Sequence, residues 1–414
     1  MNTNLPFKSL DSVDVRGKRV LLRLDINSPI DPVSKKIVND NRIVQSGPTL
    51  SYLLEQKAKV AIIAHQGDTL DYQNLISMEE HASLLSKVVG FPIAYIDDVC
   101  GPSAQQEIKD LKEGEAILLG NLRYLSEEIS AFEEVVPLKV EQMKDTYLVR
   151  SLVHLFDLYV NEAFSAAHRS SPSMVAFQYL IPSVAGPLLF KEVEALTKVM
   201  RQPERPSVFV LGGAKISDAF GMMEKVLQDG SADTIITTGV TGEVFLLAKG
   251  YNLGSLVDDF LTQRSMKKYI LQAKEILDSY SESILCPVDL AYEKDGKRVE
   301  VAIEELPLDE LFLDIGKESI ALFKRVIQQS GTLFVNGPAG KFESPLFEEG
   351  TKELWTAIST STGYSVVGGG DSVLAASRFC RLEDFDYVCT AGGAMVKFLS
   401  GKPLPLLIAL ENSK

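Results

Sequence analysis

The 414-residue sequence has little cysteine, histidine or tryptophan, with four, four and one residues respectively. The cysteines, Cys100, Cys286, Cys380 and Cys389, are scattered and form no CxxC pair. We therefore expect buried thiols in a reducing, cytoplasmic compartment, and neither a zinc site nor a disulfide framework. No run of about 18 apolar residues is present, which argues against a membrane span. The N-terminal residues lack an apolar signal core, which argues against secretion.

The sequence also has fewer basic than acidic residues. The chain has 42 basic and 56 acidic residues, and its formal net charge is −14. An acidic chain disfavours nucleic acid and anionic membranes as partners. Any basic cluster around a ligand must then be a local feature. The hydrophobic content of 45% is typical of a globular protein, and the length predicts two domains.

One pattern recurs along the chain. A short apolar, β-branched run ends in a polar or glycine-rich turn, and a helical segment follows. Apolar strands that alternate with helices predict an α/β fold whose parallel sheets are buried on both faces. We expect two doubly wound, Rossmann-like domains joined by a hinge helix, with a cleft between them. The runs are 19–25, 59–65, 116–123, 157–164, 207–215, 233–239, 284–289, 332–340, 364–371 and 386–393.

The strand ends differ between the two halves of the chain. Charged residues and histidine follow the strands up to about residue 180, and glycines follow those from about residue 205. Ligands of doubly wound sheets bind beyond the carboxyl ends of the strands. The first half is therefore predicted to hold a small anion with side chains. The second is predicted to let the backbone approach a nucleotide closely.

Proline and glycine mark the connection between the halves. Pro182, Gly186 and Pro187 lead into a helical stretch at 188–200, which we expect to be the hinge. We predict an N-terminal domain over 1–182 that binds the small anion and a C-terminal nucleotide-binding domain over 188–399. The tail, 400–414, is apolar and is expected to pack back against the N-terminal domain.

Nine motifs, in order and at matching spacing, resemble those of phosphoglycerate kinase along nearly the whole chain. The HQG form and the absence of a lysine after GGAKISD resemble the archaeal branch. The resemblance implies reversible phosphoryl transfer between 1,3-bisphosphoglycerate with ADP and 3-phosphoglycerate with ATP, in glycolysis or gluconeogenesis. We expect a monomer that acts on small molecules. The motifs are RLDINSP (23–29), NDNRI (39–43), AHQG (64–67), LGNLRY (119–124), YVNEAFSAAHR (159–169), LGGAKISD (211–218), NGPAGKFE (336–343), GGGDS (368–372) and TAGGA (390–394).

Four arginines come from separate strand–loop units that can converge at one sheet edge: Arg23, Arg42, Arg123 and Arg169. Guanidinium groups match the oxygens of phosphate and carboxylate. His65 and His168 add donors, and carboxamide and carboxylate oxygens could accept from substrate hydroxyls. The resemblance assigns phosphoglycerate binding to Asp25, Asn27, Arg42, His65, Arg123 and Arg169. Taken singly, an arginine on a helix is more often a solvated charge, and His65 could be a satisfied core histidine.

The nucleotide half has no Walker A motif. The nearest segment, GPAGKF at 337–342, carries Phe342 where serine or threonine should coordinate magnesium. Three glycines and Asp371 instead precede a helix, which places backbone N–H groups at its N-terminus, where phosphate is favoured. Asp371 is suited to hold Mg²⁺ on ATP or ADP. Each glycine cluster, taken alone, could equally make a tight turn.

The resemblance completes this half-site. It gives Lys215 a contact with nucleotide phosphate and Glu343 a contact with ribose. It gives Gly212, Gly213 and Gly337 a backbone lining of the nucleotide. Gly369, Gly370 and Ser372, at the helix N-terminus, are also expected to bind the nucleotide. Arg42, Lys215 and the helix N-termini that carry Gly370 and Gly393 are expected to stabilise the transition state.

Four positions depart from the common family pattern. Asp68 stands where many members have a substrate-site arginine, and Ala219 where bacterial and eukaryotic forms have a catalytic lysine. Ser171 replaces a common second histidine, and Ala391 lies in a glycine run. A carboxylate near phosphate repels it. Two alternatives therefore stay open: a related kinase for another small hydroxy or carboxylic acid, and a non-catalytic nucleotide-binding paralogue.

Overall fold

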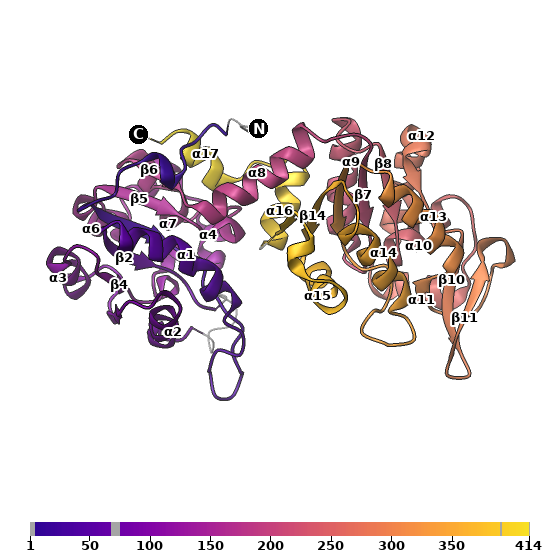
Figure 1. Cartoon of the computed structure of the whole chain (residues 1–414), viewed down its shortest axis with the longest axis horizontal. Coiled ribbons are helices and arrows are strands. Elements are labelled where there is room, and N and C mark those ends of the chain that lie inside the picture. Colours follow the sequence, from indigo (N-terminus) through magenta and orange to yellow (C-terminus); the bar gives the residue numbers. More distant parts are fainter. Residues whose placement is uncertain (1–4, 68–74, 390, 414) are drawn as a thin grey trace. The chain divides into compact units, whose positions relative to one another are not determined.

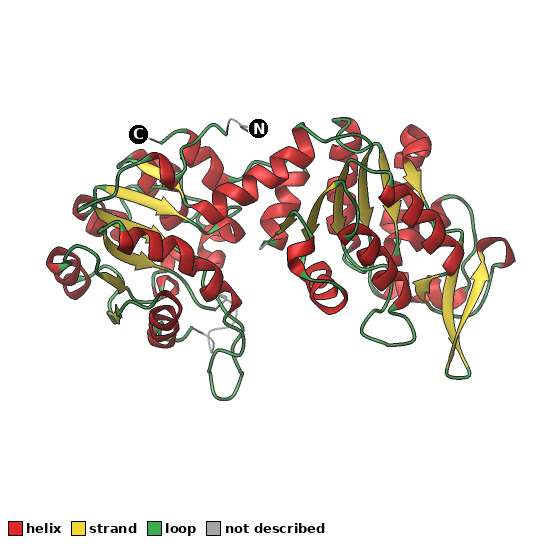
Figure 2. Cartoon of the chain, viewed as in Figure 1, coloured by secondary structure: helices red, strands yellow, loops and turns green. Residues whose placement is uncertain are grey.

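The chain divides into two compact units in a computed structural model that describes residues 5–67, 75–389 and 391–413. Unit 1 comprises Met1–Val193 and Pro403–Lys414, and unit 2 comprises Glu194–Lys402 (Figure 1). The division falls inside helix α8 (Pro187–Arg201), within the stretch expected to be the hinge. Each unit is built on a six-stranded parallel sheet flanked by helices (Figure 2), which confirms the α/β class. No helix among the described residues is long and apolar enough to span a membrane.

The sheet of unit 1 has the order β3-β4-β2-β1-β5-β6. The chain starts in the middle of the sheet at β1, builds one side through β2, β3 and β4, and then places β5 on the other side of β1. The point where the order reverses therefore lies between β1 and β5, where a doubly wound sheet binds its ligand. The strands are β1 (Arg19–Arg23), β2 (Lys59–Ile63), β3 (Ile93–Tyr95), β4 (Ala116–Leu118), β5 (Leu158–Asn161) and β6 (Ser183–Ala185).

The helices of unit 1 bury their apolar faces against this sheet. In α1, Ile43, Leu50 and Leu54 are fully buried at helical spacing. The C-terminal helix α17 belongs to the same unit, since the Leu406 N–H donates to the Ala167 carbonyl at 3.2 Å. The helices are α1 (Asn41–Glu55), α2 (Glu79–Val89), α3 (Pro102–Asp110), α4 (Ser130–Val135), α5 (Val140–Met143), α6 (Tyr147–Leu152), α7 (Pro172–Val175) and α17 (Pro405–Glu411).

The sheet of unit 2 has the order β15-β14-β13-β7-β8-β9. It reverses between β7 and β13, so the loops after these two strands meet at the switch point. Strands were expected at all of these places, although β9 and β15 are only two residues long. The strands are β7 (Ser207–Leu211), β8 (Thr234–Thr237), β9 (Ile284–Leu285), β13 (Thr332–Asn336), β14 (Tyr364–Gly368) and β15 (Tyr387–Val388).

The helices of unit 2 enclose a core around Trp355, the single tryptophan of the chain. In α13, Ile320, Phe323 and Ile327 face this core at helical spacing. The helices are α9 (Ile216–Gln228), α10 (Gly239–Ala248), α11 (Ser255–Gln263), α12 (Lys268–Tyr280), α13 (Lys317–Gln328), α14 (Glu349–Ser359), α15 (Gly370–Phe379) and α16 (Gly392–Leu399).

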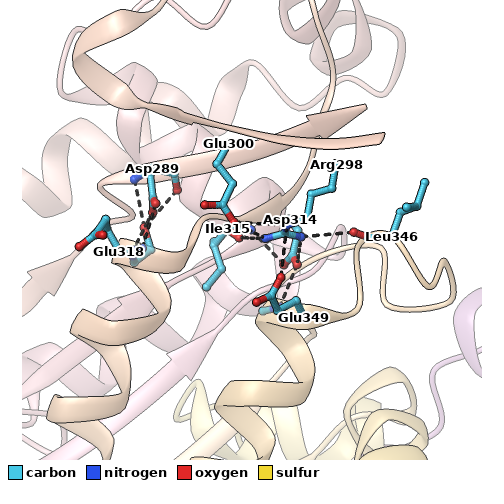
Figure 3. A network of polar contacts seen from close by, with 10 residues as sticks. Asp289, Arg298, Glu300, Asp314, Ile315, Glu318, Leu346 and Glu349 are labelled. Atoms are coloured by element: carbon cyan, nitrogen blue, oxygen red, sulfur yellow. Dashed lines mark hydrogen bonds and ion pairs between the residues drawn. The ribbon is translucent and has the colours of Figure 1, made fainter. Parts of the chain in front are cut away.

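A second, antiparallel sheet in unit 2 was not predicted. It consists of β10 (Asp289–Lys294), β11 (Lys297–Ala302) and β12 (Phe312–Ile315). Arg298 of β11 pairs with Asp314 of β12 at 2.7 Å, and the Gly350 N–H in α14 donates to the same carboxylate at 2.8 Å (Figure 3). Asp314 is buried, and burial raises its pKa to about 6. The buried Asp314 carboxylate thus links the antiparallel sheet, through Arg298, to the start of α14, through the Gly350 N–H.

Replacement of Arg298 by methionine should destabilise unit 2 by about 3 kcal/mol or more, because the buried Asp314 carboxyl loses its cation. Urea unfolding followed by Trp355 fluorescence measures this, since Trp355 is buried in unit 2. Arg205→Met is the control. Arg205 and Asp233 form a pair whose side chains are 49% and 42% exposed, so its loss should cost at most about 1 kcal/mol. Equal effects of the two variants would contradict the assignment.

Candidate active site

Three of the predicted arginines and one histidine converge in unit 1. Arg23, His65, Arg123 and Arg169 line one small pocket, which we call the arginine pocket; its other lining residues are Glu128, Ala166, Ser171 and Met174. Arg23 is the last residue of β1, and His65, Arg123 and Arg169 follow β2, β4 and β5 of the same parallel sheet. The strand order therefore accounts for their meeting at one edge.

Arg23 and His65 form the floor of the arginine pocket. Arg23 is 3% exposed and His65 is 8% exposed, and the Arg23 Nη2 lies 2.9 Å from the His65 Nδ1. Burial, followed by the charges of Arg23 and Arg123, lowers the pKa of His65 well below its usual value. The imidazole is therefore neutral at pH 7, and its Nδ1 accepts a hydrogen bond from the guanidinium.

Two of the three guanidinium nitrogens of Arg169 are bound by side chains of α4. Its Nε donates to a Glu133 carboxylate oxygen at 2.7 Å and its Nη1 to the Ser130 hydroxyl at 2.5 Å. Among the described residues, its Nη2 has no hydrogen-bond partner, and neither has the buried Nε of Arg23. Buried N–H groups normally have partners. These two N–H groups lack partners in a pocket that three arginines line. They therefore favour an anion in the arginine pocket.

One carboxylate enters the arginine pocket. Glu128 is buried and accepts from the Ser173 N–H at 2.7 Å and from the Ser173 hydroxyl at 2.6 Å. Its backbone carbonyl accepts from the Arg123 Nη1. Burial raises the pKa of Glu128.

The remaining predicted residues of unit 1 lie outside the arginine pocket. Arg42 on α1 pairs with Asp25 at 2.6 Å, and the same carboxylate accepts from the Ser165 hydroxyl. Asn27 accepts from the Gly67 N–H at 3.0 Å. Arg42 is near enough to contribute to the lowered pKa of His65. His168 is half-buried and is not among the residues that line the arginine pocket.

Gln66 joins the loops that carry the predicted residues, a role that sequence reasoning missed. Its side chain bonds both the Ser28 N–H and the Ser28 carbonyl at 2.9 Å, and its backbone pairs with the Asn121 carboxamide. The Nε2 of His81, a residue to which no role was given, lies 2.9 Å from the Oε1 of the Gln66 side chain. Burial lowers the pKa of His81 to about 4, so it stays neutral. A glutamine between a histidine and a glycine offered no local signal of this function.

The predicted glycine clusters of unit 2 surround one cavity of about 220 Å³, which we call the glycine cavity. It lies at the switch point between β7 and β13. The N-termini of α9, α15 and α16 all border it, and each helix end carries partial positive charge. Its lining includes Gly212, Gly213, Lys215, Gly337, Gly369, Gly370, Asp371, Ser372, Gly392 and Gly393.

Glycine has two different effects here. Gly337 has φ +90°, and a Cβ there would overlap the carbonyl oxygen of Gly212. The two loops can therefore touch only as bare backbone. At Gly370 and Gly393 a Cβ would meet nothing within 4 Å. These two glycines leave open space in front of the helix N-termini, which a phosphate group could fill.

Lys215 and Asp371 form an exposed pair across the glycine cavity. Their side chains are 70% and 55% exposed, and the Nζ lies 3.1 Å from the carboxylate. Such a pair contributes little to stability, so both groups can exchange partners for a phosphate and its cation. Ser372 is buried, and its hydroxyl accepts from the Gly337 N–H at 2.7 Å. This bond supports the loop after β13, and the contact of Ser372 with the nucleotide stays a prediction.

A larger cavity of about 470 Å³ continues from the glycine cavity, sharing Gly213, Ala214, Pro338 and Asp371 with it. We call it the apolar cavity, because Phe260, Leu290, Leu311 and Phe312 form much of its wall. Glu343, predicted to bind ribose, is exposed on its lining. Asp314, fixed by Arg298, also lies in this wall. A phosphate-sized space joined to an apolar cavity has the form of a nucleotide site.

The departures from the family pattern have different structural consequences. Asp68 lies outside the described residues. Ala219 is buried on α9, and Ser171 is buried in the wall of the arginine pocket. Ala391 has φ −125°, so that position does not need glycine.

Replacement of His65 by glutamine should reduce the acid sensitivity of the fold. The pKa of His65 is depressed in the folded state, so its contribution to stability is present above about pH 6.5 and lost as pH falls below that value. Between pH 6.5 and 5.5, wild type should lose about 1 kcal/mol more unfolding free energy than the variant. Urea titrations followed by circular dichroism test this, and equal losses in both proteins would contradict a neutral His65.

Comparison with known proteins supports one family. The family model described as phosphoglycerate kinase matches residues 10–402. The phosphoglycerate kinase of Methanothermus fervidus is 40% identical over 408 residues, covering 99% of this chain and 98% of that protein. That of Pyrococcus furiosus is 39% identical over 401 residues, covering 96% and 95%. These relatives are archaeal, as the HQG motif indicated.

Comparison with solved structures supports the same family. The crystal structure of phosphoglycerate kinase from Pyrococcus horikoshii OT3 matches with a TM-score of 0.86 at 36% identity, covering 98% of each chain. The enzyme from Coxiella burnetii matches with a TM-score of 0.82 at 33% identity, covering 98% of this chain and 99% of that one. Full-length similarity in sequence and in fold shows that the chain belongs to the phosphoglycerate kinase family.

Proposed function

We propose that the arginine pocket of unit 1 holds phosphoglycerate, and that the glycine cavity and the apolar cavity of unit 2 hold ATP or ADP. The activity follows from the family: reversible transfer of a phosphoryl group between a nucleotide and the carboxyl group of 3-phosphoglycerate. The observation that carries the assignment is the concentration of buried guanidinium charge in the arginine pocket of a chain whose net charge is −14.

The arginine pocket suits the phosphate of 3-phosphoglycerate. Arg23, Arg123 and Arg169 present planar donors, and the Arg23 Nε and Arg169 Nη2 have no hydrogen-bond partner among the described residues. Asp25, Asn27 and Arg42 lie in the adjoining loops after β1 and on α1. We assign the substrate hydroxyl to Asp25 and Asn27, and the carboxylate that becomes phosphorylated to Arg42. His168 stays a proposed donor beside the pocket.

The reaction needs positioning and charge neutralisation more than covalent chemistry. In the direction of ATP synthesis, an anionic oxygen of ADP attacks the acyl phosphate, and the carboxylate of 3-phosphoglycerate leaves. No protein group has to take a proton or carry the phosphoryl group. Lys215 and the N-termini of α15 and α16, at Gly370 and Gly393, would neutralise the charge of the moving group. Because each unit holds one substrate, transfer requires both to be bound in one complex.

Asp371 is suited to hold magnesium on the nucleotide. Magnesium with a nucleotide commonly uses one or two carboxylates together with phosphate oxygens and water, and Asp371 offers one exposed carboxylate at the junction of the two cavities. When bound, the cation would supply further positive charge to the phosphates. Gly212, Gly213, Gly337 and Gly369 would line the phosphates with backbone, and Glu343 would contact the ribose.

We also propose that the chain acts as a monomer in the cytoplasm, in glycolysis or gluconeogenesis. None of the four cysteines forms a disulfide in the part of the chain that the structure describes, and three of them are buried. Cysteines without disulfides are typical of a reducing compartment.

The assay of the proposed function couples phosphorylation of 3-phosphoglycerate by MgATP to NADH oxidation through glyceraldehyde-3-phosphate dehydrogenase. Wild type should turn over, and Arg169→Ala should lose at least about 100-fold in kcat/KM, because a charged donor to the substrate is removed. The control is Arg150→Ala, since Arg150 is exposed on α6. Circular dichroism confirms folding of each variant. Near-normal kinetics of a folded Arg169→Ala would refute the role of the arginine pocket.

A further inference from the structure

A carboxylate beside the arginine pocket of unit 1 has no part in the proposed chemistry. Glu133 lies on α4, and its two oxygens bind consecutive residues. Its Oε2 accepts from the Arg169 Nε at 2.7 Å, and its Oε1 accepts from the Ser170 N–H at 2.6 Å. The side chains of Arg169 and Glu133 are only 18% and 22% exposed. A carboxylate partly cancels the charge of a guanidinium next to it, so its place beside an arginine that is proposed to bind an anion needs a physical reason.

Packing of α4 does not supply that reason. Of the six described residues of α4, none is buried, so an apolar face does not determine where Glu133 lies. The contacts that join Ser130 and Glu133 to Arg169 and Ser170 are hydrogen bonds, and they are directional. The position of α4 and the orientation of the Arg169 guanidinium are therefore coupled through these bonds.

Glu133 determines which part of the Arg169 guanidinium is left for a ligand. A guanidinium can bind an anion along the side formed by Nε and Nη2, or at the end formed by Nη1 and Nη2. Because Glu133 occupies Nε, the side of the fork is not available to a substrate. The buried Nη2 has no hydrogen-bond partner among the described residues. Arg169 therefore offers the end of its fork to an anion in the arginine pocket.

Arg23 is fixed by the protein in the same sense but at other atoms. Its Nη1 donates to the Leu24 carbonyl and its Nη2 to the His65 Nδ1, while its buried Nε has no partner in the described part of the chain. In both arginines, protein acceptors orient the guanidinium and leave a different nitrogen for the ligand. The acceptor in Arg23 is neutral, and in Arg169 it is the Glu133 carboxylate.

We propose that Glu133 is a positioning residue, which holds the Arg169 guanidinium so that Nη2 is presented to the phosphate of 3-phosphoglycerate. This inference rests on the proposed placement of 3-phosphoglycerate in the arginine pocket. An arginine that is oriented beforehand loses less side-chain freedom when the ligand binds, which is worth about fivefold in affinity. The charge that Glu133 cancels is a smaller loss, because Arg23 and Arg123 line the same pocket.

The effect should appear in binding and not in the chemical step. The phosphate of 3-phosphoglycerate is not the group that is transferred, so its contacts are the same in the ground and transition states. Loss of Glu133 should therefore raise Kd and KM for 3-phosphoglycerate and leave kcat and the KM for MgATP unchanged.

The first test measures the affinity for 3-phosphoglycerate by isothermal titration calorimetry. Glu133→Ala should bind about fivefold more weakly than wild type. Glu133→Gln should lie between the two, because its single oxygen can accept from Arg169 or from Ser170 but not from both. Glu134→Ala is the matched control, since Glu134 is exposed on the same helix and its loss changes the charge equally. It should bind like wild type.

A double-mutant cycle separates positioning of Arg169 from a general structural role. In the coupled assay, Glu133→Ala should lower kcat/KM for 3-phosphoglycerate about fivefold in wild type and by less than about twofold in Arg169→Ala. If Glu133 only fastened α4, the two losses would multiply. If Glu133→Ala does not fold, Glu133→Gln and Ser130→Ala, which removes the Nη1 contact alone, complete the same cycle.

Each outcome decides the proposal. Tighter binding by a folded Glu133→Ala or Glu133→Gln would overturn it, because the carboxylate would then compete with the ligand. Losses that multiply in the double variant, or an effect on kcat alone, would also overturn it. Failure of the proposed function has a different signature: a folded Arg169→Ala that binds 3-phosphoglycerate like wild type.

Discussion

The order of strands in the two parallel sheets is the constraint on which the candidate site depends. In each sheet the chain begins at a central strand, builds one side, and then returns to build the other. The loops after the two central strands therefore diverge and leave space at the carboxyl edge. In unit 1 this space lies after β1 and β5, and in unit 2 after β7 and β13. The predicted residues are distributed around these two points.

In the proposed function, the two units meet the demands of an anionic ligand in different ways. Unit 1 uses buried guanidinium groups, and the neutral His65 accepts from Arg23 without adding charge. Unit 2 uses helix N-termini and bare backbone, with Lys215 as an exposed cation. Fixed side-chain charge suits a small substrate that must be oriented. Backbone N–H groups suit phosphates, which need close approach on several sides.

Much of the fold could be predicted from the sequence because buried parallel strands are continuous apolar runs. The misses have physical reasons. β3 and β6 are the two edge strands of their sheet: only Ile93 of β3 is buried, and β6 lies between Pro182 and Gly186, which read as the connection between the halves. The hairpin of β10 and β11 had an available signal: Asp295 and Gly296 have φ values of +51° and +71°, as the Asp-Gly pair of a two-residue hairpin turn requires.

Some residues of the candidate site could be predicted from the sequence and others could not. Arginines and glycines that follow strands were predictable, because strand ends of one sheet share an edge. Gln66 and Glu128 were not predictable, since their importance arises from burial, which appears only when distant segments pack. Asn121, in the LGNLRY motif, was part of a recognised pattern, but its link to Gln66 depends on the pairing of β2 with β4.

The central claim is that one chain holds its two substrates in separate units, each at a switch point. Amide hydrogen exchange with each ligand alone tests this most directly. 3-Phosphoglycerate should slow exchange in the loops after β1, β2, β4 and β5 and leave unit 2 unchanged. MgADP should slow exchange after β7, β13 and β14 and at the start of α10 and leave the loops of unit 1 unchanged. Protection of the same unit by both ligands would contradict the account.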